Sequence, residues 1–438
     1  MPFAHLDCAA VGRSLTQLST RPEDLADAYF ERTETLELPG SGATPGVRVR
    51  REEGFALRLT RERQTWLASR DGFDSKDFGQ ALRQVARVYP SAAYPAPRLE
   101  VGPWDGPPAA PELTELTSAL ERSIRAHHVA FPLMLTARRH RRWLRVVSGP
   151  LVTEPEQEGF YSCTVELPWG THGALFPKLG PPAVAHLADH LVETFRARRA
   201  PPPEPFRGVV VLGPGATAVL LHEAIAHSLE ADLLALSGHP EGAVGVRLGR
   251  RELSVLDDPA TAPEEVRRRT DDEGRTVRRR WLLREGVVQQ PLADAAWAEG
   301  SEILIPGAAR RGDRHGPPDP RSSHLELLAG DTAEDDLRAE AEGGLWIAEA
   351  SRGSLDPLTG VFELGFVAAR RIRGGAIGEP VGAGLLSGRI ADLLGSLTAV
   401  GDERRLAGAG WCAKGGRKVP VWATCPAVRL EGLAVTPW

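Results

Sequence analysis

Two histidines and a glutamate lie inside one apolar stretch of this 438-residue chain: His222, Glu223 and His227. The residues around them are almost all apolar, namely Val219, Leu220, Leu221, Ala224, Ile225, Ala226 and Leu229. This pattern predicts a buried helix, which we place over residues 216–236. Burying two imidazoles and a carboxylate without partners costs free energy, so the fold must supply a partner. A shared cation would do so, because these groups are the ligands and the general base of hydrolytic metal centres.

The spacing of the two histidines leaves two possibilities open. On a regular α-helix, residues five apart project about 140° from each other. The four-residue spacing of the common zinc-protease motif separates the rings by only about 40°. Either His222 and His227 do not share an ion, or the helix widens locally, because an i→i+5 π-turn returns such positions to one face. A shared ion therefore predicts a distorted helix between the two histidines.

A third ligand must come from another part of the chain, because a catalytic zinc usually has three protein ligands and one open position. The candidates are Glu230, Asp232, His239, His315 and Cys412. Cys412 is attractive because its Gly-rich segment, residues 408–416, lets the backbone approach closely, and the cation of Lys414 would favour a thiolate. A buried inert thiol is the alternative for Cys412. For the histidine pair, the alternative is two core histidines with satisfied hydrogen bonds beside a structural glutamate.

The length of the chain exceeds one ordinary hydrophobic core and favours two domains. The Pro-rich stretch 200–205 cannot continue a helix, so we place the domains at 1–202 and 203–438. With 42% hydrophobic residues, 25% charged residues and a net charge of −5, the composition is typical of globular proteins. Two arginine triplets, 267–269 and 278–280, are flanked by acidic residues, and we expect no nucleic-acid partner.

The sequence gives no sign of membrane insertion or export. No stretch reaches the 18 apolar residues of a membrane span, and the first residues lack a basic segment followed by an apolar core. We therefore expect a cytoplasmic protein without a membrane partner. Four scattered cysteines, Cys8, Cys163, Cys412 and Cys425, are too few for a disulfide framework.

Hydrophobic periodicity predicts an α/β first domain with an antiparallel sheet. Apolar residues at helical spacing predict helices over 6–18, 75–88, 112–126 and 183–198. Alternating apolar residues predict a hairpin within 28–59, with its turn at Glu52-Glu53-Gly54. Further strands are expected over 129–136, 142–148 and 160–167.

The second domain is expected to be mainly β-structure built around the helix that carries the histidines. A buried strand over 208–212 and a turn at 213–215 lead into that helix. Other strands are predicted over 281–283, 287–288, 345–347, 361–372 and 419–435, with Gly374-Gly375 as a hairpin turn and a short helix over 385–397. Segment 306–324 has no periodicity and predicts a loop. The fold class is therefore α+β.

Several segments occur in the order that is typical of the TldD/PmbA family of metallopeptidases, and they resemble its metal-bearing TldD side. The two strongest are HEAIAHSLEAD at 222–232 and GWCAKGGRKVPV at 410–421. Weaker likenesses are GVRVRREEGFALRL at 46–59, DDEG at 271–274, GAARRGDRH at 307–315 and LDPLTGVFELGF at 355–366. Several weak motifs in one order are more specific than any one of them.

The resemblance implies a zinc-type divalent ion held by His222, His227 and Cys412. Glu223 would be the general base that acts on metal-activated water. The resemblance also implies that small or unfolded peptides are hydrolysed in a chamber formed by a dimer, either a homodimer or a heterodimer with a PmbA-like subunit. The alternative from a different class is a non-catalytic, PmbA-like scaffold subunit.

Four residues of the loop keep open roles at this point: Arg310, Arg311, His315 and Arg321. They could line the cleft and grip a peptide carboxylate or carbonyl. The preferred interpretation is that they are solvated loop charges.

Overall fold

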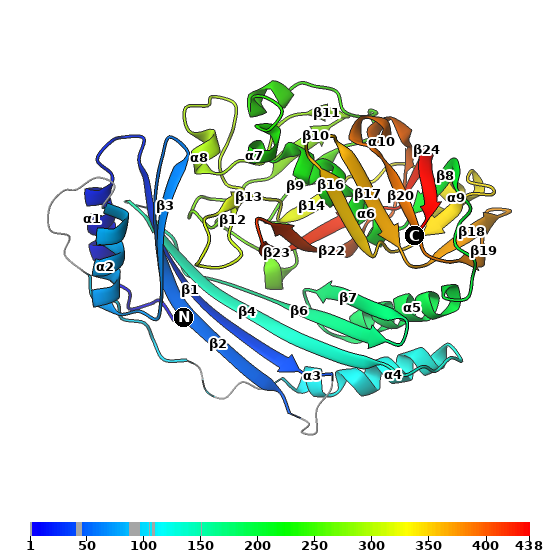
Figure 1. Ribbon diagram of the computed structural model, residues 1–438, viewed down its shortest axis with the longest axis horizontal. Coiled ribbons are helices and arrows are strands. Elements are labelled where there is room, and N and C mark those ends of the chain that lie inside the picture. The colour runs from blue at the N-terminus through cyan, green and yellow to red at the C-terminus, as the bar shows by residue number, and fades with distance from the viewer. Residues whose placement is uncertain (1, 41–45, 87–96, 105, 107–109, 150) are drawn as a thin grey trace.

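The computed structural model describes residues 2–40, 46–86, 97–104, 106, 110–149 and 151–438. Long, curved strands of the first half sweep beneath the second half of the chain (Figure 1). The molecule mixes helices and strands and is dominated by strands, which confirms a mixed α and β fold. No helix in the described ranges is both long and apolar enough to cross a bilayer. Cys8, Cys163, Cys412 and Cys425 are all free thiols, as expected.

The first half forms a seven-stranded antiparallel sheet of order β3-β2-β1-β4-β6-β7, with β5 paired to β4. Its strands are β1 (Leu25–Leu38), β2 (Arg48–Arg61), β3 (Gln64–Asp71), β4 (Met134–Ser148), β5 (Leu151–Val152), β6 (Glu156–Leu167) and β7 (Gly170–Phe176). The helices are α1 (Cys8–Leu18), α2 (Ser75–Ala86), α3 (Pro111–Thr114), α4 (Leu116–Ala126) and α5 (Pro181–Ala197). The predicted helices are thus confirmed in place, but the one over 112–126 is divided at Glu115 into α3 and α4, and residues 87 and 88 lie outside the described residues.

Side chains of β1 alternate between two environments, as the period of a strand requires. Ala28 and Phe30 pack into the apolar core that includes residues of α1 and α2. Asp27, Tyr29 and Glu31 point the other way, where they contact arginines of the second half. One face of the sheet is therefore covered by helices of the first half, and the opposite face packs against the second half.

Two strand predictions in this sheet were wrong. The predicted turn at Glu52-Glu53-Gly54 lies inside β2, which pairs without interruption with β1 and β3. Gly54 does not form a turn. It allows β2 and β3 to approach closely, because a Cβ at this position would lie 2.1 Å from the Arg70 carbonyl oxygen. The strands predicted over 129–136 and 142–148 are joined into one strand, β4, which starts at Met134, because a charged residue between them pairs with an acid across the sheet; Arg138 Nε lies 2.6 Å from Glu37 Oε2.

The second half contains a nine-stranded and a six-stranded sheet. The larger has the order β16-β17-β20-β24-β8-β15-β18-β19, with β21 paired to β24; the smaller has the order β11-β10-β9-β14-β23-β22. The larger consists of β8 (Phe206–Leu212), β15 (Leu345–Ile347), β16 (Arg352–Asp356), β17 (Val361–Phe366), β18 (Ala369–Arg373), β19 (Ala376–Val381), β20 (Gly384–Arg389), β21 (Leu397–Val400) and β24 (Val428–Pro437). The smaller consists of β9 (Val255–Asp257), β10 (Arg280–Arg284), β11 (Val287–Val288), β14 (His324–Leu327), β22 (Arg405–Lys414) and β23 (Arg417–Cys425).

Helix α6 (Pro214–Leu220) and its continuation lie in the apolar core that both sheets share. Leu220, Ala224 and Ile225 belong to one buried cluster with residues of β8, β10, β14 and β24. The remaining short elements of this half are α7 (Ala231–Leu234), η3 (Pro240–Ala243), η4 (Glu264–Val266), α8 (Ala295–Ala298), β12 (Ala309–Arg310), β13 (Asp319–Pro320), α9 (Glu334–Ala339) and α10 (Ile390–Ser396). The helix that carries His222 and His227 is therefore packed between the two sheets of the second half.

Several boundaries predicted for this half need correction. Segment 361–372 forms two strands, β17 and β18, that are not neighbours in the sheet, and 419–435 divides between the two sheets as β23 and β24. Residues 385–397 form mostly β20 and α10, and Pro214 starts a helix where a turn was predicted. The hairpin turn at Gly374-Gly375 is confirmed, with φ of 55° and 74° and Arg373 paired with Ala376. The domain boundary at 202/203 stays a prediction.

Buried ion pairs join the two halves. Arg58 of β2 lies 2.6 Å from Glu273, and Arg311 lies 2.8 Å from Asp27 of β1. Asp272 is fully buried; its Oδ1 lies 2.6 Å from Arg268, and its Oδ2 accepts the backbone N–H of Arg311 at 2.6 Å. Arg268 and Arg280 are also buried, so the two arginine triplets do not form a continuous basic surface.

Asp272→Ala should lower the free energy of unfolding by about 3–5 kcal/mol, because it leaves buried guanidinium groups without a negative partner. Burial alone would raise the pKa of Asp272, but the charge of Arg268, with those of Arg142 and Arg310, holds it well below the usual carboxyl value. A lowered folded-state pKa contributes stability above the unfolded pKa and loses it as the pH falls. The deficit of the variant should therefore be constant from pH 6 to 8 and shrink in acid, as measured by denaturant unfolding.

A matched control is Glu403→Ala, which breaks an ion pair of similar length, 2.8 Å to Arg405, on the exposed surface. Water screens that pair, so the unfolding midpoint should not change. Equal midpoints for Asp272→Ala and the control would contradict the structural role of the buried pairs.

Candidate metal centre

The helix widens at the two histidines. Helix α6 continues as a π-helical turn, η1 (Leu221–Ala226), and then as a 3₁₀ turn, η2 (His227–Leu229). The backbone N–H of His227 donates to the carbonyl of His222, which is the i→i+5 bond of a π-turn. The two ring centroids lie 4.5 Å apart. The predicted distortion is therefore confirmed, although the helix ends at Glu230, whose ψ of 127° is extended, instead of running to residue 236.

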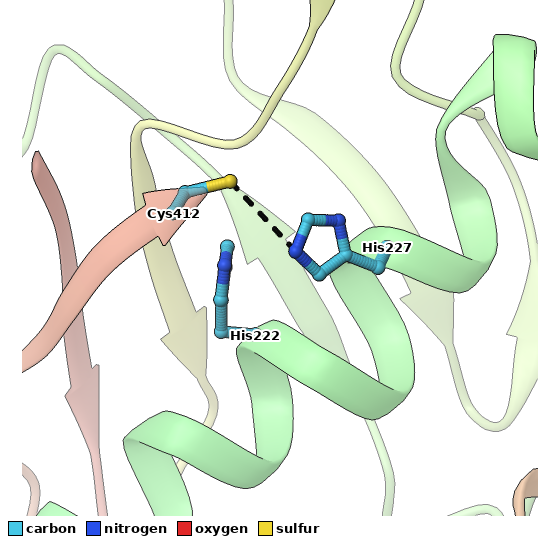
Figure 2. Close-up of side chains that lie close together, drawn as sticks. All are labelled: His222, His227 and Cys412. Atoms are coloured by element: carbon cyan, nitrogen blue, oxygen red, sulfur yellow. Dashed lines mark hydrogen bonds between the residues drawn. The ribbon is translucent and has the colours of Figure 1, made fainter. Parts of the chain in front are cut away.

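Cys412 reaches the histidine pair from β22, 185 residues further along the chain. Figure 2 shows its sulfur and both imidazoles pointing toward one another. One ligand atom from each of the three side chains lies within 4.8 Å of the others, and Sγ is 3.7 Å from Nε2 of His227. The structure thus brings together the three residues that the resemblance implied.

The donor atoms fit a metal ion. Nδ1 of His222 lies 3.3 Å from Oγ of Ser322, whereas its buried Nε2 has no hydrogen-bond partner among the described residues. A buried ring nitrogen without a partner is costly unless a cation occupies its lone pair. Two imidazole nitrogens and a thiolate are also a ligand set that zinc prefers.

The other candidates for a third ligand have different partners. Glu230 Oε2 lies 3.0 Å from Nδ1 of His227, on the side of the ring opposite to Cys412. Asp232 pairs with Lys414, His239 is exposed, and Nδ1 of His315 lies 3.2 Å from Oγ of Ser69. Of the five candidates, Cys412 is the residue that completes the cluster.

Glu230 holds His227 and is itself held by a cation. Lys414 Nζ donates to Glu230 Oε2 at 2.7 Å and to Asp232 Oδ1 at 2.7 Å. Burial opposes the charge on His227, but Glu230 raises the pKa of that imidazole well above its ordinary value. A carboxylate on the remote nitrogen of a ligand histidine fixes the ring orientation and makes the ring a better donor. The ion pair between Lys414 and Glu230 also joins the helix of the histidines to the hairpin that carries Cys412.

The cation beside the thiol is Arg321, not Lys414 as predicted from sequence. Nη1 of Arg321 lies 3.7 Å from Sγ of Cys412 and donates to the Cys412 carbonyl at 3.1 Å. Nη2 donates to the carbonyl of Lys414 at 2.9 Å. Arg321 is fully buried, so it both locks the hairpin and places a positive charge beside the sulfur.

The interpretation of the loop arginines as solvated charges was wrong for three of the four residues. Arg310, Arg311 and Arg321 are buried, because Arg311 pairs with Asp27 of the first half, whereas Arg310 donates to the Ser323 hydroxyl and Arg321 to carbonyls of the hairpin that carries Cys412. Their hydrogen bonds are internal, which leaves little capacity for gripping a peptide. His315 is half-exposed, as the solvated interpretation expects.

Glu223 lines a cavity of about 1200 Å³ between the seven-stranded sheet and the second half. The cavity wall also includes Thr33, Thr35, His140, Glu349 and Trp411. Burial raises the pKa of the Glu223 carboxyl, against the attraction of His227. Gly353 makes room for this side chain, because a Cβ there would lie 2.4 Å from Glu223 Cγ. Glu223 and Trp411, which line this cavity, are the sequence neighbours of His222 and Cys412.

A buried His-His-Cys set beside a cavity that contains a carboxylate has the parts of a metal-dependent hydrolase site. The sequence profile of the PmbA/TldA metallopeptidase C-terminal domain matches residues 207–437. The chain belongs to the PmbA/TldD family of metallopeptidases.

The similar proteins carry metalloprotease names. A metalloprotease from Methanothermobacter thermautotrophicus is 32% identical over 244 residues, which cover 55% of this chain and 52% of that protein. A metalloprotease TldD homolog from Haemophilus influenzae is 30% identical over 228 residues, or 52% and 47% of the two chains. The chain thus spans about half the length of the curated relatives it matches.

Solved structures match over nearly the whole chain. TldE from Thermococcus kodakarensis has a TM-score of 0.70 at 16% identity, and covers 98% of this chain and 100% of its own. A putative modulator of a DNA gyrase from Thermotoga maritima also has a TM-score of 0.70, at 18% identity, with coverage of 98% and 99%. At these identities the likeness establishes the fold.

Proposed function

We propose that this chain is a metal-dependent peptidase whose ion is held by His222, His227 and Cys412. The observation that carries the proposal is the convergence of three ligand atoms within 4.8 Å, together with a buried nitrogen of His222 that has no hydrogen-bond partner among the described residues. The ligand types favour zinc. A relative from Saccharolobus solfataricus, 24% identical over 227 residues, is named a zinc metalloprotease TldD homolog, which agrees with that choice.

Different residues of the chain have separate roles in the proposed reaction. When bound, a divalent ion would supply Lewis acidity at a peptide carbonyl and make water a stronger acid. The carboxylate of Glu223 takes a proton from the attacking water and passes it to the leaving amine, as a general base and then a general acid. Glu230 orients His227, and Arg321 holds the hairpin of Cys412.

The proposed substrates are small or unfolded peptides. A cavity of about 1200 Å³ is far smaller than a folded domain, whose radius of gyration is about 13 Å at 100 residues. We propose that a second subunit closes the cavity into a chamber, either another copy of this chain or a PmbA-like partner. A cytoplasmic location and the division at 202/203 belong to the same proposal.

The test is metal removal. Chain purified without chelator should carry about one divalent ion and cleave unstructured peptides, as followed by mass spectrometry. Chelation should stop the cleavage, and zinc should restore it, because the ion supplies the Lewis acid. One bound ion without any cleavage, with or without a PmbA-like subunit, would favour the scaffold alternative. Cleavage that persists after complete metal removal would contradict the proposal.

A further inference from the structure

A second carboxylate, Glu349, lies in the wall of the cavity that contains Glu223. It follows β15 and also borders a smaller adjoining cavity of about 360 Å³. The apolar part of that smaller cavity is formed by Trp346, Ala348, Ala368, Ala369 and Ile377. Glu349 therefore lies where the main cavity opens into an apolar pocket.

The charge of Glu349 is poorly compensated. Its nearest basic group is Nε2 of His186, at 3.4 Å, on a half-exposed side chain. No lysine or arginine in the described part of the chain pairs with it. Burial raises its pKa, which His186 offsets only in part. In contrast, Glu193 in the same pocket pairs with Arg370 at 2.7 Å.

The fold makes space for this carboxylate. The missing side chain of Gly215 leaves room for the carboxylate, because a Cβ there would lie 2.0 Å from Oε2 of Glu349. About a quarter of the Glu349 side chain is still exposed, at 27%. The carboxylate is thus packed against Gly215 and remains accessible from the cavity.

We propose that Glu349 binds a primary ammonium group of the peptide substrate, supplied by its N-terminus or by a lysine side chain. This inference rests on the proposed peptidase function and names a feature of its substrate. An ammonium group would be a stronger partner for Glu349 than the single imidazole of His186, and it donates three hydrogen bonds. The apolar pocket beside Glu349 would receive the side chain or the methylene stem next to that ammonium.

The position of Glu349 sets a distance to the proposed general base. Gly215, which touches Glu349, and Glu223 are eight residues apart along the helix, or roughly 12 Å at 1.5 Å per residue. Three or four residues of an extended peptide cover that distance at about 3.3 Å each. With the N-terminus on Glu349, cleavage should fall after the third or fourth residue.

The test compares three hexapeptides with a C-terminal fluorophore: one with a free N-terminus, one N-acetylated, and one N-acetylated with lysine at its first position. Affinities are measured by fluorescence anisotropy on the Glu223→Gln variant, which separates binding from cleavage. The free or the lysine peptide should bind roughly tenfold or more tightly than the acetylated one, because hydrogen bonds to charged groups are strong. The peptide that regains affinity identifies the source of the ammonium.

Glu349→Gln in the same background should bring the three affinities together, with an unchanged melting temperature. Asp189→Asn, which alters a carboxylate of the same pocket that lies 2.9 Å from His127, should preserve the discrimination. The inference is overturned if the three peptides bind alike, if none binds, or if Glu349→Gln keeps the preference. Cleavage of any of these peptides by the unaltered chain would still support the peptidase function, so the two failures are distinguishable.

Discussion

His222→Ala should leave the purified chain without a bound ion and reduce peptide cleavage to background. The same result is expected for His227→Ala and Cys412→Ser, because each removes one of three ligand atoms that converge within 4.8 Å. The loss of metal affinity should exceed the roughly 10–100-fold that follows from altering a residue behind a ligand. Competition with a chromophoric chelator measures that affinity, and the metal content of the purified variants checks it.

Two further variants calibrate this result. Glu230→Gln should weaken metal binding by roughly 10–100-fold, because Glu230 only orients His227 and contributes no ligand atom. Cys163→Ser alters another buried free thiol, in the first half of the chain, and should keep the ion. The proposed site is wrong if His222→Ala binds zinc as tightly as the unaltered chain, or if Cys163→Ser and Cys412→Ser lose it equally.

The geometry of the histidine pair could be predicted from sequence because it is a local property. An interval of five positions from His222 to His227 is compatible with a shared ion only if the helix widens, and the structure contains that π-turn. The partner of the pair is not a local property. Cys412 lies 185 residues beyond His227 on strand β22, and the residues alone left five candidates for the third ligand. Only the resemblance to a family selected Cys412.

Residues that support the ligands were harder to predict, because their partners are backbone atoms. Arg321 binds the carbonyls of Cys412, Lys414 and Arg417, which carry no sequence signal. Lys414 was correctly singled out as a cation near Cys412, but it pairs with Glu230 and Asp232 instead of the thiol. An arginine in a loop without periodicity is predicted to be solvated, because its hydrogen-bond acceptors cannot be identified from the sequence.

The two wrong strand predictions have a common physical cause. The seven-stranded sheet is buried on both faces near its centre, and ion pairs fill the face that meets the second half. Charged residues such as Glu53 and Arg142 therefore lie within strands, although an alternation of apolar and polar residues would place them at turns or ends. Burial of paired charges hides the pattern on which strand prediction depends.

Glu223→Gln should reduce kcat by roughly 10²–10⁴-fold, the contribution expected of a positioned general acid–base group. The substitution keeps the size of the side chain and its place against Gly353, but it removes the group that accepts the proton. Metal content should be unchanged, because Glu223 is not a member of the ligand cluster. Single-turnover cleavage of an unstructured peptide, at saturating zinc, measures the chemical step.

Comparison with Glu230→Gln separates the two roles that we propose for these carboxylates. Glu230 is fully buried behind His227, so its variant should lose metal affinity but recover nearly full kcat once zinc saturates the site. Glu223 lines the cavity, so its variant should keep the ion and stay inactive at any zinc concentration. If Glu223→Gln cleaves peptides at the unaltered rate, another group moves the proton. If neither variant changes cleavage, the cluster is not the site of peptide hydrolysis, and a structural ion in a scaffold subunit becomes the better account.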